Sequence, residues 1–73
     1  MNPEAIRTFI QKRPFEPFEV ILSSGQTYRV SHPDAVMLLK NTLVIGDVER
    51  DAVIWCSLIH VTAIRGTQQS LAG

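Results

Sequence analysis

The chain has 73 residues, 45% of them hydrophobic and 19% charged, and its seven basic and seven acidic residues give a formal net charge of zero. A chain of this length forms one domain and buries only about 60% of its unfolded surface, so its core needs additional support. Zero net charge argues against a domain that acts mainly through long, non-specific contacts with phosphates. We expect part of the apolar surplus to form a contact between subunits. The sequence therefore predicts a homo-oligomer, which ranges from a dimer to a ring.

The single cysteine, Cys56, excludes a disulfide bond within the chain. No apolar run approaches the length that spans a bilayer, and the chain does not open with the basic and then apolar segments of a signal peptide. These features predict a cytoplasmic location, no membrane contact and no small-molecule substrate or cofactor.

Residues 3 to 12 have the pattern of a short amphipathic helix. Asn2 suits the N-cap, and Ile6, Phe9 and Ile10 recur at helical spacing to form one apolar stripe. About ten residues do not hold a helix in water alone, so we expect this helix to lie on a sheet or on a neighbouring subunit.

Two prolines then end the helix within the stretch RPFEPFE, residues 13 to 19. Phe15 and Phe18 lie in this stretch, and Trp55 lies further along the chain. We interpret these three residues as core or interface anchors, because large aromatic side chains dominate both environments.

Alternating apolar and polar residues predict two strands, 18–23 and 27–31, joined by a tight turn in which Gly25 adopts a positive φ. A connector containing Pro33 follows. Three apolar segments come next, at 35–39, 43–45 and 52–56, with a turn at Lys40-Asn41 and a polar loop over 46–51. Such continuous apolar runs are typical of strands that are buried on both faces.

Residues 57 to 65 allow two interpretations. Leu58, Val61 and Ile64 recur at intervals of three, which fits a 3₁₀ turn around 57–59 followed by a last strand to about Ile64. A short terminal helix is the alternative, although β-branched residues disfavour it. Residues 66 to 73 are predicted to form a frayed tail.

Together these patterns predict a mainly β domain. An N-terminal helix precedes five short strands, which form a strongly bent antiparallel sheet or a small SH3-like barrel over residues 17–65. Bending would hide apolar edges that a flat sheet of this size leaves exposed.

The segment Val36-Met37-Leu38-Leu39-Lys40-Asn41-Thr42, after Asp34, resembles the central strand and turn of the Hfq branch of Sm-like proteins. The order of helix, hairpin, central strand, variable loop and closing strand is similar too. The resemblance implies a bent five-stranded SH3-like barrel whose copies join edge to edge into a ring that binds single-stranded RNA. The opening segment 13–18 and the connector 31–33 resemble instead a group of small bacterial proteins with no assigned activity.

The chain departs from the Sm-like pattern where that family contacts bases. The family has Asp-Gln-Phe before its central strand, whereas this chain has Asp34-Ala35 and is one residue shorter. The family's Tyr-Lys-His triplet falls near residues 55–57, which keep an aromatic ring and neither basic group. The family's Ile-Arg-Gly also comes earlier than residues 64–66 of this chain.

Candidate contacts for single-stranded RNA combine basic or polar groups with an aromatic ring on which a base can stack. They are Tyr28, Arg29, Lys40 and Asn41. A basic patch at the end of the helix is a further candidate, formed by Arg7, Lys12 and Arg13. The alternative is that these side chains are scattered charges that keep the surface soluble.

Cys56 and His60 are the one pair that suggests catalysis, but no third group orients them. A free cysteine more often serves as a small buried hydrophobic residue. A metal site would have to draw on His32, Asp34, Cys56 and His60, which lack a recognised ligand spacing. We therefore expect no catalytic residue and no metal.

Two functional hypotheses follow. The first is a non-catalytic Sm-like module that self-associates through strand edges and binds single-stranded RNA. The second is a structural or regulatory module that binds proteins and makes no nucleic-acid contact.

Overall fold

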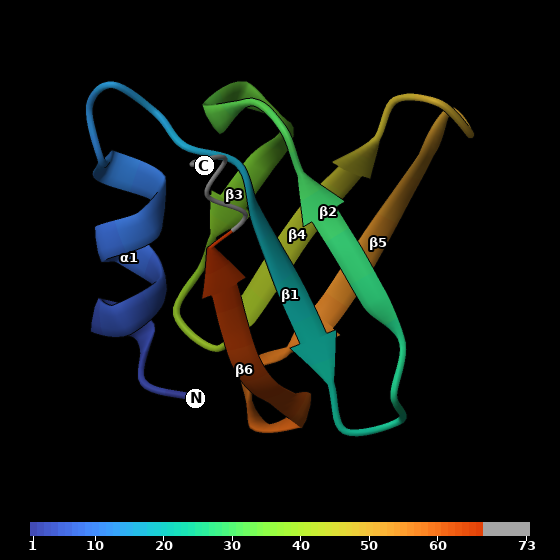
Figure 1. The fold of residues 1–73 in the computed structure, drawn as a ribbon. Helices are drawn as coiled ribbons and strands as arrows, with labels where there is room; N and C mark the ends of the chain where they lie inside the picture. Colours follow the sequence, from blue (N-terminus) through green and yellow to red (C-terminus); the bar gives the residue numbers. More distant parts are fainter. Residues whose placement is uncertain (67–73) are drawn as a thin grey trace.

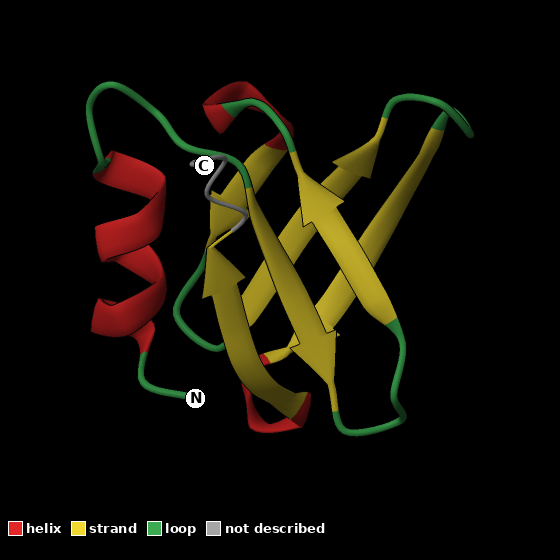
Figure 2. Cartoon of the chain, in the orientation of Figure 1, coloured by secondary structure: helices red, strands yellow, loops and turns green. Residues whose placement is uncertain are grey.

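The computed structural model describes residues 1–66, which form one α-helix and six strands in two three-stranded antiparallel sheets (Figures 1 and 2). Two short 3₁₀ helices, labelled η1 and η2, lie between strands. The elements in chain order are α1 (Pro3–Gln11), β1 (Phe18–Leu22), β2 (Thr27–Val30), η1 (Pro33–Ala35), β3 (Val36–Leu38), β4 (Thr42–Asp47), β5 (Ala52–Ser57), η2 (Leu58–His60) and β6 (Val61–Gly66). Sheet A has the order β2-β1-β6 and sheet B the order β3-β4-β5. The prediction of a mainly β fold with one N-terminal helix is confirmed.

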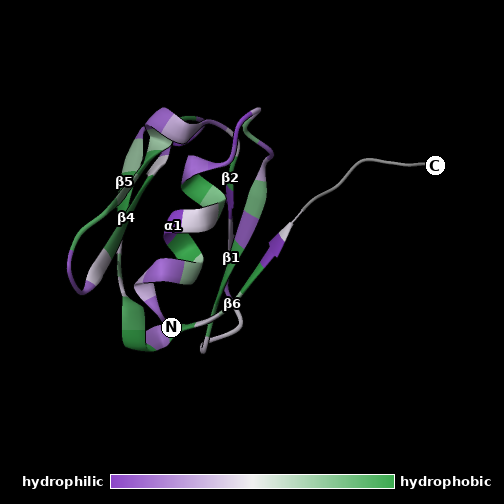
Figure 3. Cartoon of the chain, turned by 90° about the vertical axis from the view of Figure 1, so that its left-hand side faces the viewer, coloured by the Kyte–Doolittle hydropathy of each residue, from purple (hydrophilic) through white to green (hydrophobic). Residues whose placement is uncertain are grey.

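The helix α1 begins where its cap predicts. The Asn2 side chain accepts a hydrogen bond from the Glu4 N–H at 2.9 Å. Ile6 is the one fully buried residue of the helix, and α1 contacts β3. Seen from the side of the helix, α1 lies in front of the space between the two sheets (Figure 3). The helix therefore closes one side of the core.

The hairpin of β1 and β2 turns at Gly25, whose φ is +94°. The Leu22 N–H donates to the Gln26 carbonyl oxygen at 2.9 Å, and the Gly25 N–H donates to the Leu22 carbonyl oxygen at the same distance. Glycine suits this turn because a side chain would strain the backbone at a positive φ.

The predicted count of five strands was wrong by one, and the sheets do not close into a barrel within residues 1–66. In the segment for which a 3₁₀ turn with a strand and a short helix are the two interpretations, Ser57 ends β5, Leu58–His60 form the 3₁₀ turn η2, and Val61–Gly66 form the strand β6. Between β2 and β3 the chain turns through η1, where the Ala35 N–H donates to the His32 carbonyl oxygen at 3.1 Å. Pro33 has no N–H to continue a ladder, so the two strands stay separate and join different sheets.

The hairpin of β4 and β5 is longer than predicted, because β4 runs to Asp47, inside the polar stretch interpreted as a loop. Asp47 stabilises the turn through both carboxylate oxygens: Oδ1 accepts from the Arg50 N–H at 3.2 Å, and Oδ2 pairs with Nη1 of Arg50 at 3.0 Å. Asp51 has a φ of +53°, a conformation that aspartate tolerates better than most residues. The acidic residues therefore build the turn.

The core lies between the two sheets. Its buried residues are Ile6, Phe18, Val20, Val30, Leu43, Ile45, Cys56, Leu58 and Val61. Phe18 lies at its centre on β1, with ring centroids 5.4 Å from Phe9 and 5.9 Å from Phe15. The predicted tail falls outside the described residues, apart from Gly66, which ends β6.

Candidate functional site

The outward face of sheet A is charged. Its central row runs across all three strands, because Glu19 on β1 faces Arg29 on β2 and Arg65 on β6. The Glu19 carboxylate accepts from Nε of Arg65 at 2.8 Å. Such a row is the ordinary solvated face of an antiparallel sheet.

The outward face of sheet B is apolar. Its central row consists of Met37 on β3, Val44 on β4 and Trp55 on β5, which are direct cross-strand neighbours. Trp55 is 69% exposed, Val53 58% and Met37 57%. We call these four residues, Met37, Val44, Val53 and Trp55, the sheet B face. An exposed apolar patch on three adjacent strands is typical of a protein-binding surface.

The sequence does not predict the sheet B face as a surface; of its four residues, only Trp55 is among the residues expected to be core or interface anchors. Its residues lie in the apolar runs that were interpreted as buried on both faces. In the structure the inward residues Leu43 and Ile45 are buried, whereas Trp55 on the opposite face is open. The signal in the sequence was the presence of apolar residues at both alternating positions of β5.

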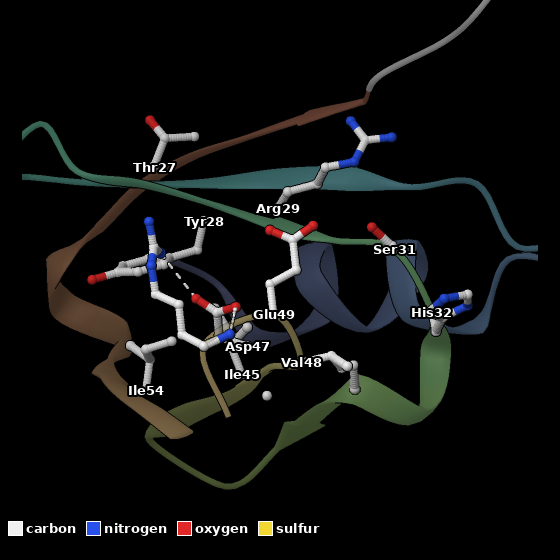
Figure 4. A pocket seen from close by; sticks show the side chains of 13 residues that line it. Thr27, Tyr28, Arg29, Ser31, His32, Ile45, Asp47, Val48, Glu49 and Ile54 are labelled. Carbon is white, nitrogen blue, oxygen red and sulfur yellow. Dashed lines mark hydrogen bonds and ion pairs between the residues drawn. The ribbon is translucent and has the colours of Figure 1, made fainter. Parts of the chain in front are cut away.

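A pocket of about 390 Å³ opens between β2 and the β4–β5 hairpin (Figure 4). Tyr28, Asp47 and Ile54 lie at one end of it and His32 at the other. The apolar residues Ile45 and Ile54 form its floor, and the guanidinium of Arg29 points away from them (Figure 4). The pocket combines an apolar floor with a mixed polar rim.

The four candidate RNA contacts form two separate groups. Tyr28 and Arg29 line the pocket at the end of β4, whereas Lys40 and Asn41 form the exposed turn before β4 begins. Six residues of strand separate these ends, or about 20 Å. One short stretch of nucleotides would therefore have to cross the molecule to touch both groups.

The basic residues around α1 are engaged locally. Arg7 pairs with Glu4 at 2.6 Å and Lys12 with Glu16 at 3.0 Å. Nη1 of Arg13 donates to the carbonyl oxygen of Ile10 at 2.9 Å. Two of the three therefore have a carboxylate partner that offsets their charge.

Cys56 and His60 lie in different environments. Cys56 is buried, and burial raises the pKa of its thiol, which disfavours the reactive thiolate. His60 is exposed at the end of η2. Within residues 1–66, no three histidine, cysteine or acidic side chains gather closely enough to hold a metal ion.

The three predicted anchors also differ in environment. Phe18 is fully buried, Phe15 is half-buried against it, and Trp55 is largely exposed on the sheet B face. Phe15 and Phe18 therefore belong to the core side of sheet A, and Trp55 to the surface.

None of the helices formed by residues 1–66 is long and apolar enough to cross a membrane. No protein-family model, curated protein or solved structure matches the chain.

Proposed function

We propose that the chain is a non-catalytic binding module with an SH3-like or Sm-like fold. It binds protein chains, copies of itself first, through the sheet B face and the adjoining edge of β5. A structural or regulatory role that rests on protein contacts alone is the form of this proposal that the geometry supports best.

The order of the elements supports an SH3-like or Sm-like fold. β1 pairs with both β2 and β6, while β3, β4 and β5 form a meander in the second sheet. A 3₁₀ turn, η2, leads directly into the last strand. If β2 and β3 are one strand interrupted by η1, the chain has the five strands of a bent barrel.

The contrast between the two outward faces carries the proposal. Sheet A has a row of three charged side chains, whereas the corresponding row of sheet B has none. Both sheets bury their inner faces in the same core, so among residues 1–66 the outward face of sheet B is the apolar one of the two outward sheet faces. A partner would remove that apolar surface from water.

Replacing Trp55 with serine is expected to weaken self-association by at least about 30-fold, because each buried aromatic anchor contributes about 2 kcal/mol or more to binding and each copy loses one. The measurement is molar mass by light scattering over a dilution series. The natural chain should show a mass that rises with concentration, and the Trp55→Ser chain should stay a monomer over most of that range.

Ile59→Ser is the matched control, because Ile59 is 81% exposed but lies on η2, outside the sheet B face. It should leave the dilution curve unchanged. A larger effect for Ile59→Ser than for Trp55→Ser would contradict the proposal and place the contact at η2.

Binding of single-stranded RNA is a second candidate function, supported by the half-buried ring of Tyr28 in the pocket and by the next residue on β2, Arg29, whose guanidinium points out of the pocket. A base stacked on an aromatic side chain contributes about 1–3 kcal/mol. Lys40 and Asn41 are exposed and lie at the other end of β4.

Arg29→Ala should weaken binding of oligo-U or oligo-A at low salt and reduce the slope of log affinity against log salt by about one phosphate contact. Lys40→Ala tests the opposite end of β4, and fluorescence anisotropy measures both. Arg7→Ala is the control, because Arg7 is paired with Glu4 on the helix. If the natural chain binds neither oligonucleotide at low ionic strength, this second function is ruled out.

A further inference from the structure

Within the described residues 1–66, β5 is an edge strand, and no other strand pairs with its outer edge. The Leu58 N–H donates to the Asn41 carbonyl oxygen at 3.0 Å, one step beyond the last β4–β5 pair. Hydrogen-bonded and non-hydrogen-bonded pairs alternate along an antiparallel ladder, so Cys56 and Ile54 are the residues bonded to β4. The residues whose N–H and C=O groups point away from β4 are Val53, Trp55 and Ser57.

This edge lacks the features that keep strand edges from pairing, which are charges, prolines, short length and cover by another element. β5 has six residues, AVIWCS, with no charge and no proline. The other edge strands are protected: β2 carries Arg29, β6 carries Arg65, and β3 has three residues and contacts α1. The unprotected edge also borders the sheet B face.

We propose that two copies of the chain pair antiparallel through β5 about a two-fold axis, which joins the two B sheets into one sheet of six strands. This inference rests on the proposed function and specifies its partner and geometry. A two-fold contact brings identical residues together at the axis, so a charge there would meet its own copy. The absence of charge on β5 removes that repulsion.

The residue pattern selects one register. The outward-pointing backbone groups must face each other, which leaves two registers near the centre of the strand. In the first, Trp55 lies opposite Val53 of the second copy and Ile54 lies opposite itself. In the second, Trp55 opposes Trp55, and Val53 opposes Ser57 of the second copy. The first register forms two favourable pairs of an aromatic with a β-branched residue. The second forms one favourable aromatic pair and places both Val53 side chains opposite Ser57. Because the first register has the larger number of favourable pairs, we assign it.

The proposed contact buries a small area. Covering the exposed part of Trp55, which is 69% open, would bury on the order of 150 Å² per copy. A contact made by one strand edge and two such side chains buries less than the roughly 1,200 Å² of total area that is usual for stable complexes. We therefore expect a dimer that dissociates on dilution, and not a permanent one.

Amide hydrogen exchange of the natural chain tests the pairing. The amides of Val53 and Trp55 are free of β4 in one copy and hydrogen-bonded in the proposed dimer. We expect their exchange to slow by at least about 10-fold between dilute and concentrated samples. The amides of Ile54 and Cys56 are bonded to β4 in either state and serve as internal controls.

Two lysine substitutions provide the second arm. Val53→Lys places a charge at the paired edge and should abolish the dimer. Ile59→Lys places the same charge on η2, outside the sheet B face, and should retain the dimer. Both residues are more than half exposed, so both variants should fold, which circular dichroism checks.

Each outcome of these experiments is decisive. A natural chain that stays monomeric at every concentration would overturn both this inference and self-association. A concentration-dependent dimer with unprotected Val53 and Trp55 amides, or one broken by Ile59→Lys and not by Val53→Lys, would overturn the edge pairing and leave self-association standing.

Discussion

Replacing Phe18 with alanine is expected to destabilise the domain by about 3–5 kcal/mol, the usual cost of truncating a buried phenylalanine. Phe18 has no exposed surface, lies on the central strand of sheet A, and contacts the rings of Phe9 and Phe15. A chain of 73 residues has a total stability of about 4–11 kcal/mol. The substitution should therefore leave the domain largely unfolded at room temperature or close to that point.

Urea denaturation followed by circular dichroism measures this loss, at a concentration low enough to keep the chain monomeric. Trp55→Ala is the matched control, because it removes a larger ring from a site that is 69% exposed. Its free energy of unfolding should change by less than about 1 kcal/mol. Equal losses for the two variants would show that Phe18 is not the centre of the core.

The parts of the fold that follow from short stretches of chain could be predicted. Asn2 and the spacing of Ile6, Phe9 and Ile10 are local signals for the helix, and Gly25 between two alternating segments is a local signal for the hairpin. Each depends on residues within one or two turns of each other. These signals can be recognised without knowing which distant strands pair with each other.

The division into two sheets could not be predicted in the same way. β1 pairs with β6 across more than forty residues, as in the contact of Glu19 with Arg65. The residue types of each segment predict that it forms a strand, but they do not predict that these two strands pair with each other. The η1 turn at Pro33 then decides that β2 and β3 join different sheets, and the same Pro33 could equally have marked a bend within one continuous strand.

The candidate site shows the same limit. A run of apolar residues such as 52–56 indicates that both faces of a strand are apolar, but it does not indicate what covers each face. Met37, Val44 and Trp55 come together only through the register of three strands. Conversely, Tyr28 and Lys40 were grouped as RNA contacts by residue type, and the length of β4 sets them at opposite ends of the strand.

Replacing Ile6 with alanine is expected to cost about 2–5 kcal/mol and to detach α1 from the sheets. Ile6 is the one residue of the helix with no exposed surface, and a helix of nine residues is not stable in water by itself. Without this side chain the apolar stripe keeps only the half-buried Phe9 and Ile10. The helix should then unfold before the strands do.

Thr8→Ala is the control for this substitution, since Thr8 is exposed on the same helix and alanine is the better helix former. It should raise stability by a few tenths of a kcal/mol or leave it unchanged. The measurement follows the far-ultraviolet helix signal and the exchange of α1 amides against those of β1. If Ile6→Ala kept α1 amides as protected as Thr8→Ala does, the helix would be held by contacts other than the core, and its role in closing the space between the sheets would be wrong.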